Sequence, residues 1–165
     1  MHRTTLVLTL ALTASAHADS RAYRIENNRL LVPTPIVFDA GKDTLEATSA
    51  EAIAYVAGYL EAKTYVSTLR IEVHSDSMGT EKFNQALTEK RAFAVGKALV
   101  AKGVDCKRLL AVGFGSTKPV ANNDTAANKA KNRRTELVNA ALRGRPIGGL
   151  PLDGGGVVAG DLCGK

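Results

Sequence analysis

Tryptophan is absent from this chain, and aromatic residues are limited to 4 tyrosines and 4 phenylalanines. No segment interleaves aromatic with basic residues, which argues against a nucleic-acid-binding protein despite the formal net charge of +6. Histidine is also scarce, because His2 and His17 lie close to the N-terminus and leave His74 alone in the rest of the chain. A two-histidine zinc site is therefore excluded there, and we expect neither a metal nor a cofactor.

Long hydrophobic runs are lacking as well. The apolar stretch from Leu6 to Ala16 is too short to span a bilayer, which needs about 20 such residues. It follows Arg3 and leads into Ala16-His17-Ala18, an arrangement typical of a cleaved export signal, which we assign to residues 1–18. No cysteine follows the predicted cleavage point to carry a lipid. We expect a periplasmic protein without a transmembrane segment or a lipid anchor.

Cysteine occurs only twice, as Cys106 and Cys163. In an oxidising compartment such a pair can close a disulfide, so an intramolecular bridge is one expectation. Two alternatives stay open at this point. Cys106 can be a free buried thiol, or Cys163 can join two molecules from a flexible tail.

The hydrophobic pattern predicts alternating strands and helices. Strands are expected at 30–38, 69–73, 109–112 and 134–142, helices after Thr48 and at 80–102, and a loop with a short helix at 121–131. Pro33 and Pro35 interrupt the first strand and indicate an edge strand or an irregular segment. Thr48 and Glu51 have the spacing of a capping box, which places a helix start there.

This order, βαβαβ(α)β, predicts an α/β fold, an α+β sandwich with helices on one side of a mixed four-stranded sheet. The length suits a single domain, assigned to residues 19–142. Residues 143–165 are rich in glycine and are expected to form an extended or mobile tail. In the second strand Leu69, Ile71 and Val73 alternate with polar residues, which indicates one buried face.

Arg91 occupies an unusual position on the second helix. It stands four residues after Leu87 and four before Val95, where the helical period places an inward-facing side chain. A buried guanidinium needs an anion, since leaving it unpaired costs several kcal/mol. Asp76 or Glu51 can supply that anion in a structural salt bridge, the side chain can extend to water, or a ligand can bring a carboxylate.

Three sequence blocks resemble one known family. They are Glu72-Val73-His74-Ser75-Asp76, Leu87-Thr88-Glu89-Lys90-Arg91-Ala92 and Asn132-Arg133-Arg134-Thr135-Glu136. The resemblance is to the OmpA-like C-terminal domain, which binds peptidoglycan, and it covers about Ile36 to Val138. It implies that Asp76 binds the ammonium group and Arg91 the carboxylate at the side-chain end of diaminopimelate in the peptidoglycan stem peptide.

The same resemblance extends the site. It implies that Phe38 and Asp39 line the cleft, that Asn84, Leu87 and Thr88 contribute from the second helix, and that Arg134 supports the pocket. For Phe38 and Leu87 a simple core role is an equal alternative. The basic segment that contains Arg134 is also consistent with an ordinary solvated surface.

One departure from the family pattern concerns Val73, where the family usually has glycine. A β-branched side chain removes backbone freedom and puts the width and affinity of the pocket in question. An enzymatic triad in His74-Ser75-Asp76 is not expected, because adjacent strand residues point to opposite faces.

The sequence therefore predicts a non-enzymatic peptidoglycan-binding module of the cell wall or outer membrane, with envelope proteins as further partners. The alternative is an envelope interaction or structural module that has lost wall binding.

Overall fold

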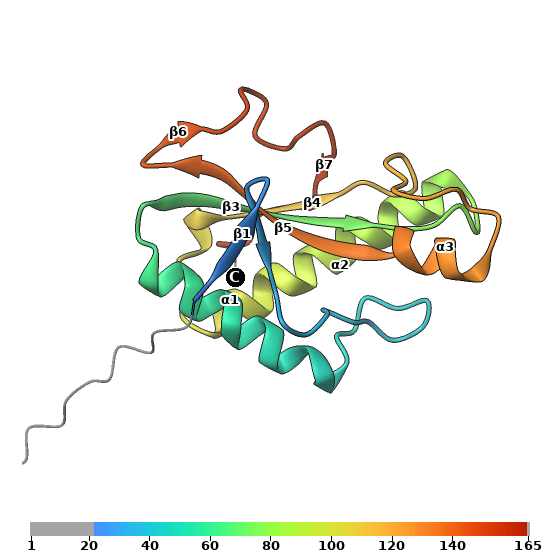
Figure 1. The fold of residues 1–165 in the computed structure, drawn as a ribbon, viewed down its shortest axis with the longest axis horizontal. Helices are drawn as coiled ribbons and strands as arrows, with labels where there is room; N and C mark the ends of the chain where they lie inside the picture. The colour runs from blue at the N-terminus through green and yellow to red at the C-terminus, as the bar shows by residue number, and fades with distance from the viewer. Residues whose placement is uncertain (1–21, 165) are drawn as a thin grey trace, which may run out of the picture.

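A computed structural model describes residues 22–164 (Figure 1), so the predicted export signal at 1–18 lies outside the described residues. The strands are β1 (Arg24–Glu26), β2 (Arg29–Leu31), β3 (Val66–His74), β4 (Leu109–Gly113), β5 (Arg134–Leu142), β6 (Arg145–Pro146) and β7 (Val157–Val158). The helices are α1 (Ala50–Ala62), α2 (Glu81–Ala101) and α3 (Ala126–Asn132), with single 3-10 turns before α1 and before β4. Among the described residues, no helix is both long and apolar enough to cross a membrane.

The sheet is built around β3, which pairs in parallel with β4 and antiparallel with β5. The strand order is β1-β2-β5-β3-β4-β7, and β6 pairs with β5. Helices α1 and α2 cover one face of this sheet (Figure 1). Leu69, Ile71 and Val73 point toward the helices and enter the hydrophobic core, as the alternation predicted. The mixed sheet with helices on one side confirms the predicted fold class.

The sheet has seven strands rather than the expected four. At the N-terminal side, the predicted strand at 30–38 is limited to β2, because Pro33 and Pro35 cannot donate to a ladder. The extra strand β1 pairs with β2 through a two-residue turn at Asn27 and Asn28, whose φ angles are 50° and 64°. Asparagine tolerates this left-handed conformation, and two such residues form the hairpin turn that suits twisted strands.

The predicted capping box at Thr48 is not formed. Helix α1 begins at Ala50 with Ser49 as its N-cap, and neither Ser49 nor any other side chain caps it. The Ser49 hydroxyl instead donates to the Val37 carbonyl at 2.9 Å and accepts from the Val37 N–H at 2.8 Å. Long-range pairing with the irregular segment thus replaces the local cap. Helix α2 does have a side-chain cap, since Thr80 accepts from the Phe83 N–H.

The buried stripe of α2 is rotated from the predicted one. Its buried residues are Asn84, Thr88, Ala92, Val95, Gly96 and Leu99, whereas the expected Leu87, Ala94 and Ala98 are only partly buried. Small and polar residues form much of the stripe because α2 lies very close to the sheet. A Cβ on Gly113 of β4 would stand only 2.5 Å from the backbone nitrogen of Glu89. Arg91 consequently lies at the edge of the interface, half-buried.

The C-terminal tail is not a free extension, because it wraps around the open edge of β4. Strand β7 pairs antiparallel with β4, and Gly156 lies against Val112 and Phe114 on the face away from the helices. Beyond β7 the chain crosses to α2, where Leu162 is buried against Gly96.

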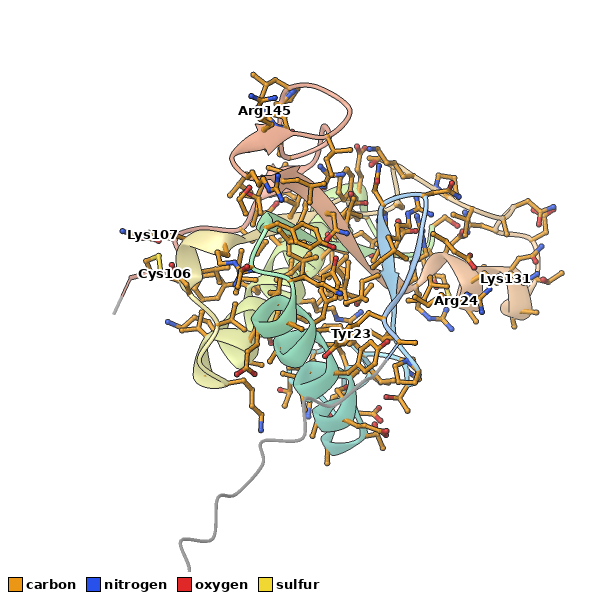
Figure 2. The ribbon with its side chains drawn as sticks, turned by 60° about the vertical axis from the view of Figure 1, so that its left-hand side comes forward. Tyr23, Arg24, Cys106, Lys107, Lys131 and Arg145 are labelled. Carbon is orange, nitrogen blue, oxygen red and sulfur yellow. A yellow bond between two sulfur atoms is a disulfide. The ribbon has the colours of Figure 1, made fainter. Side chains whose placement is uncertain are left out.

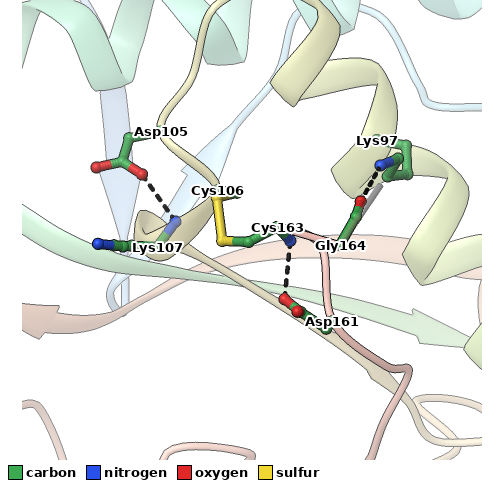
Figure 3. Close-up of a disulfide and its surroundings, with 7 residues drawn as sticks. All are labelled: Lys97, Asp105, Cys106, Lys107, Asp161, Cys163 and Gly164. Atoms are coloured by element: carbon green, nitrogen blue, oxygen red, sulfur yellow. Dashed lines mark hydrogen bonds between the residues drawn. A yellow bond between two sulfur atoms is a disulfide. The ribbon is translucent and has the colours of Figure 1, made fainter.

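The tail is fixed at its end by the predicted disulfide. Cys106 and Cys163 are bonded, with their Cα atoms 5.2 Å apart (Figure 3). The backbone N–H of Cys163 also donates to Asp161, and Lys97 donates to the Gly164 carbonyl. The intramolecular bridge is therefore confirmed over a free thiol at Cys106.

The outer face of the sheet is buried too, which the alternating pattern did not predict. Glu72 and His74 are 6% and 2% exposed. Arg70 ion-pairs with Glu72 at 2.6 Å and donates to the Leu152 carbonyl of the tail. Burial raises the pKa of Glu72, but the hydrogen bond from His74 and the charge of Arg70 together lower the pKa below its ordinary value.

We predict that the disulfide contributes measurably to stability. It closes a loop with a sequence separation of 57, for which chain-entropy reasoning gives about 4 kcal/mol. Replacing both Cys106 and Cys163 with serine should lower the melting temperature by several degrees, because even half of that energy is sufficient. Scanning calorimetry with and without reductant measures the effect. An unchanged melting temperature, or two titratable thiols in the oxidised protein, contradicts the expectation.

A second prediction concerns acid stability. The lowered pKa of Glu72 means that its contribution to folding is complete above the ordinary value of 4.5 and declines as the pH falls below it. Glu72→Gln should therefore destabilise the protein at pH 7, by about 3 kcal/mol, and the gap to wild type should shrink below that pH. Urea denaturation across the acid range tests this, with exposed Glu61→Gln as the control. A gap that stays constant with pH argues against the assignment.

Candidate functional site

The carboxylate of Asp76 is buried just beyond the C-terminal end of β3, with the residue only 5% exposed. Its Oδ1 accepts the Met78 N–H at 2.9 Å, and its Oδ2 accepts from Arg133 at 2.5 Å. The side-chain amide of Asn84 donates to the carbonyls of Asp76, at 3.2 Å, and Met78, at 2.9 Å. Asn84, in the first turn of α2, thus fixes the loop that carries Asp76. Within that loop, the Met78 N–H orients the Asp76 carboxylate.

The guanidinium of Arg91 is fixed by carbonyl groups rather than by a carboxylate. Its Nε donates to the Lys42 carbonyl at 2.8 Å and its Nη2 to the Asp39 carbonyl at 3.3 Å. The same group lies 4.9 Å from the ring centroid of Phe38, in a cation–π contact. Within the described part of the chain no carboxylate reaches salt-bridge distance of Arg91, so the alternative of a structural pair with Asp76 or Glu51 is wrong.

Burial lowers the pKa of Arg91, the nearby charge of Asp43 opposes this, and the charge of Arg133 lowers the pKa further. Two of the five guanidinium N–H groups make hydrogen bonds to the described residues. The remaining three make no hydrogen bond to the described residues.

Arg133 connects the two predicted charges. It ion-pairs with Asp76, and its influence on the pKa of Arg91 shows that it also lies near that residue. Its side chain is 49% exposed, which leaves it freedom to reorient. The arrangement is therefore one buried carboxylate followed by two guanidinium groups.

The sequence predicted a supporting role for Arg134, which stays a prediction, whereas in the structure Arg133 is the arginine that contacts Asp76. Arg134 lies opposite His74 on the neighbouring strand, ion-pairs with Glu136 at 2.6 Å and donates to the Lys118 carbonyl. Consecutive residues at the start of β5 point to opposite sides, so only one of two adjacent arginines can face the site. This alternation was the signal in the sequence that only one of Arg133 and Arg134 can contact Asp76.

The remaining predicted residues take different positions. Phe38 is half-buried beneath Arg91, and Asp39 contributes its carbonyl while its carboxylate lies 3.6 Å from Lys42. Leu87 is half-buried one helical turn before Arg91. Thr88 is fully buried, where its hydroxyl donates to the Gln85 carbonyl and accepts the Gly115 N–H. Thr88 therefore joins α2 to the loop after β4 through one donated and one accepted hydrogen bond.

The side chain of Val73 lies in the core. Its side chain is 2% exposed and packs in the hydrophobic core on the helix side of β3. On the neighbouring strand it pairs with Gly113, the residue that lets α2 approach the sheet. The volume that valine adds relative to glycine at position 73 therefore lies in the core, beside Gly113, which has no side chain.

A cluster that the sequence did not reveal lies on the outer face, where ligand atoms of Glu72, His74 and Glu136 come within 4.8 Å of one another. It joins two strands, so no local spacing signals it. Both carboxylates are paired with arginines, at 2.6 Å for Arg70 and Arg134. These cations pair with the acidic groups, so the cluster is part of an ion-pair network. The Nε2 atom of His74 lies 3.3 Å from the carboxylate of Glu72. His74 therefore faces Glu72 and does not form a nucleophile–base pair with Ser75.

The basic residues of 129–145 do not gather into one patch over the described chain. Lys131 and Arg145 lie at separate ends of the molecule in Figure 2. Of this segment, Arg133 is the residue that contacts Asp76.

Comparisons with known proteins agree with this architecture. A model of the OmpA family matches residues 37–133. The probable lipoprotein YiaD of Escherichia coli K12 is 36% identical over 118 residues, which cover 71% of this chain and 53% of YiaD. A peptidoglycan-associated lipoprotein of Buchnera aphidicola is 41% identical over 70 residues, 42% of this chain and 40% of that protein.

Among solved structures, the peptidoglycan-associated lipoprotein from Burkholderia pseudomallei superposes with a TM-score of 0.58 at 33% identity, covering 64% of this chain and 88% of that one. The chain spans about half the length of the curated relatives named above. The matched segment contains Asp76, Arg91 and Arg133 and extends over more than half of the sequence. The chain belongs to the OmpA family.

Proposed function

We propose that this protein binds peptidoglycan non-covalently through the diaminopimelate of the stem peptide and so attaches to the cell wall. The observation that carries the proposal is the state of Arg91, a half-buried guanidinium that is oriented by two carbonyls and has no carboxylate of the described residues at salt-bridge distance. Planar guanidinium groups with free N–H donors match carboxylates well. A ligand carboxylate supplies the missing negative charge.

The neighbouring groups account for the rest of the ligand. The side-chain end of diaminopimelate carries an ammonium and a carboxylate on one carbon, so it needs an anion and a cation close together. Asp76 still has acceptor capacity beyond its bonds to Met78 and Arg133, because a carboxylate offers about four lone-pair sites. In the proposed complex Asp76 takes the ammonium, and Arg91 takes the carboxylate with Arg133 beside it.

Family membership supports the wall as the target. OmpA-like domains are structural peptidoglycan-binding modules rather than enzymes, and the relatives include peptidoglycan-associated lipoproteins. Lipoproteins and an outer membrane porin among the relatives favour an envelope location. We propose export by residues 1–18 to the periplasm, wall binding by residues 19–142, and a bracing role for the tail at 143–165.

One observation favours a second candidate, an envelope interaction module that has lost wall binding. Asp76 already has a cationic partner, since Arg133 lies 2.5 Å from its carboxylate. If that pair is permanent, the ammonium of a ligand finds Asp76 neutralised. The exposed position of Arg133 weighs against permanence, because ion pairs with a solvated partner are weak.

We predict that Arg91→Ala weakens the binding of a diaminopimelate-containing muropeptide by about 2 to 5 kcal/mol, the usual cost of truncating one partner of a desolvated charge pair. Arg91→Lys should restore little, because an ammonium cannot reproduce the planar fork. Isothermal titration calorimetry measures both variants.

Two controls accompany this measurement. Arg145→Ala removes an exposed arginine that pairs with Leu142, at the opposite end of β5 from Arg133, and should leave the affinity unchanged. A muropeptide with lysine in place of diaminopimelate lacks the side-chain carboxylate and should bind wild type much more weakly. Equal dissociation constants for wild type and Arg91→Ala would refute the proposed site.

The adjacent arginines give a matched pair for a further prediction. Arg133→Ala should weaken muropeptide binding several-fold, because Arg133 ion-pairs with Asp76 and its charge acts on Arg91. Arg134→Ala should leave binding at the wild-type level, since Arg134 pairs with Glu136 on the other side of β5. The same titration distinguishes them once circular dichroism has shown both variants folded. Tighter binding by Arg133→Ala favours the second candidate, in which Arg133 blocks Asp76.

A further inference from the structure

A groove of about 490 Å³ lies between α2 and the C-terminal tail. Its walls are formed by Asp43 from the loop before α1, by Ala86, Glu89, Lys90 and Phe93 of α2, and by residues 158–161 of the tail. The volume falls within the range of about 300–1,000 Å³ that is usual for ligand pockets. The tail wall lies beyond the segment matched by the family model, which ends at residue 133. This groove is therefore a product of the chain's own C-terminal extension.

The groove is acidic although the chain is basic overall. Asp43, Glu89 and Asp161 line it together with one basic residue, Lys90. Two further cations lie nearby, because the charge of Asp43 also acts on Arg91 and Lys97 lies over the ring of Phe93. A second groove, between the C-terminal ends of α1 and α2, serves as a comparison within the same molecule. There Glu61 and Asp105 are matched by Lys102 and Arg108. The excess of negative charge is thus particular to the groove beside the tail, and it favours a cationic occupant.

Apolar surface accompanies this charge. Phe93, Ala86 and Ala159 line the groove, and the adjoining Val157 and Val158 are 48% and 44% exposed. Exposed valines next to a concave apolar surface provide contact area for a partner side chain.

Strand β7 adds a hydrogen-bonding edge to the groove. It pairs with β4 on one side and ends the strand order on the other, so its outer edge pairs with no strand of residues 22–164. An unpaired strand edge presents N–H and C=O groups to which an extended segment can add. The edge, the apolar wall and the acidic rim thus lie side by side.

The disulfide keeps this surface in place. Asp161 accepts the Cys163 N–H at 2.8 Å. Cys163 is bonded to Cys106, which lies in the 3-10 turn between α2 and β4 (Figure 3). Gly160 has a φ of 93°, a left-handed conformation that favours glycine, and an added Cβ there would stand 3.7 Å from the ring of Phe93. A preformed groove binds without first having to order its tail wall.

We propose that this groove binds an extended peptide segment of a partner protein in which basic and apolar residues alternate. The segment adds along the outer edge of β7, with its basic side chains pointing toward α2, where they pair with Asp161 and Glu89. Its apolar side chains point to the opposite face and contact Val158, which is in register with Val112 on the face away from the helices. Peptidoglycan stem peptides and anionic lipid headgroups carry negative charge that the three acidic residues repel, so a basic protein segment is the favoured occupant.

The test uses two defined probes, the acetylated and amidated pentapeptides Val-Lys-Val-Lys-Val and Val-Glu-Val-Glu-Val. Each is titrated into the ¹⁵N-labelled, oxidised protein and followed by NMR. The lysine peptide should cause saturable shifts in the amides of 157–161 and 86–93, with affinity at least about tenfold above that of the glutamate peptide. Higher salt should weaken the binding.

Matched variants complete the test. The double variant Asp161→Asn/Glu89→Gln should lose most of the lysine-peptide affinity, whereas Glu61→Gln in the comparison groove should retain it. Muropeptide binding should be unchanged in both variants, so the result is independent of the proposed wall-binding site. Equal shifts with both peptides, shifts spread over the surface, or an unaffected double variant overturn the proposal. So does protein self-association that shifts the same amides without peptide, since a second copy then fills the groove.

Discussion

The close approach of α2 to the carboxyl ends of β3 and β4 determines the geometry of the site. It depends on Gly113, because any side chain there would collide with the backbone at Glu89. Polar contacts then fix the helix in register, with Thr88 bonded to the Gly115 N–H and Asn84 bonded to the loop after β3. The helix that carries Arg91 and the loop that carries Asp76 are thereby tied together. The separation of the two charges is a consequence of packing, not of a direct bond between them.

The regular parts of this fold were predictable from the sequence because each has its own local period. Strand β5 matches its predicted range, and β3 shows the expected alternation. The small strands were not predictable, since β6 and β7 contain two residues each and exist only because the chain folds back on the sheet. The missing side-chain cap of α1 was not predictable either, because the Ser49 hydroxyl bonds to the distant backbone of Val37 instead of capping the helix.

Predictability of the candidate site follows a similar division. The motifs indicated Asp76 and Arg91, and Phe38 and Asp39 do lie beside Arg91. Which of two adjacent arginines faces the site depends on strand orientation, and Arg133 rather than Arg134 contacts Asp76. The burial of Glu72 and His74 involves residues distant in sequence, since their neighbour Arg70 reaches the Leu152 carbonyl and His74 stacks on Phe114, so no local pattern contained it. The roles of these residues in ligand binding stay predictions.

Arginine side chains have different partners on the two sides of the sheet, and this difference explains why one side suits a ligand. On the outer face Arg70 and Arg134 each pair with a glutamate, so positive charge is neutralised within the protein. Around Arg91 the acceptors are neutral carbonyls, which orient the guanidinium without cancelling its charge. An arriving carboxylate then displaces no internal anion and meets a cation already held in place. Preorganisation without neutralisation is what a binding site for a small anionic group requires.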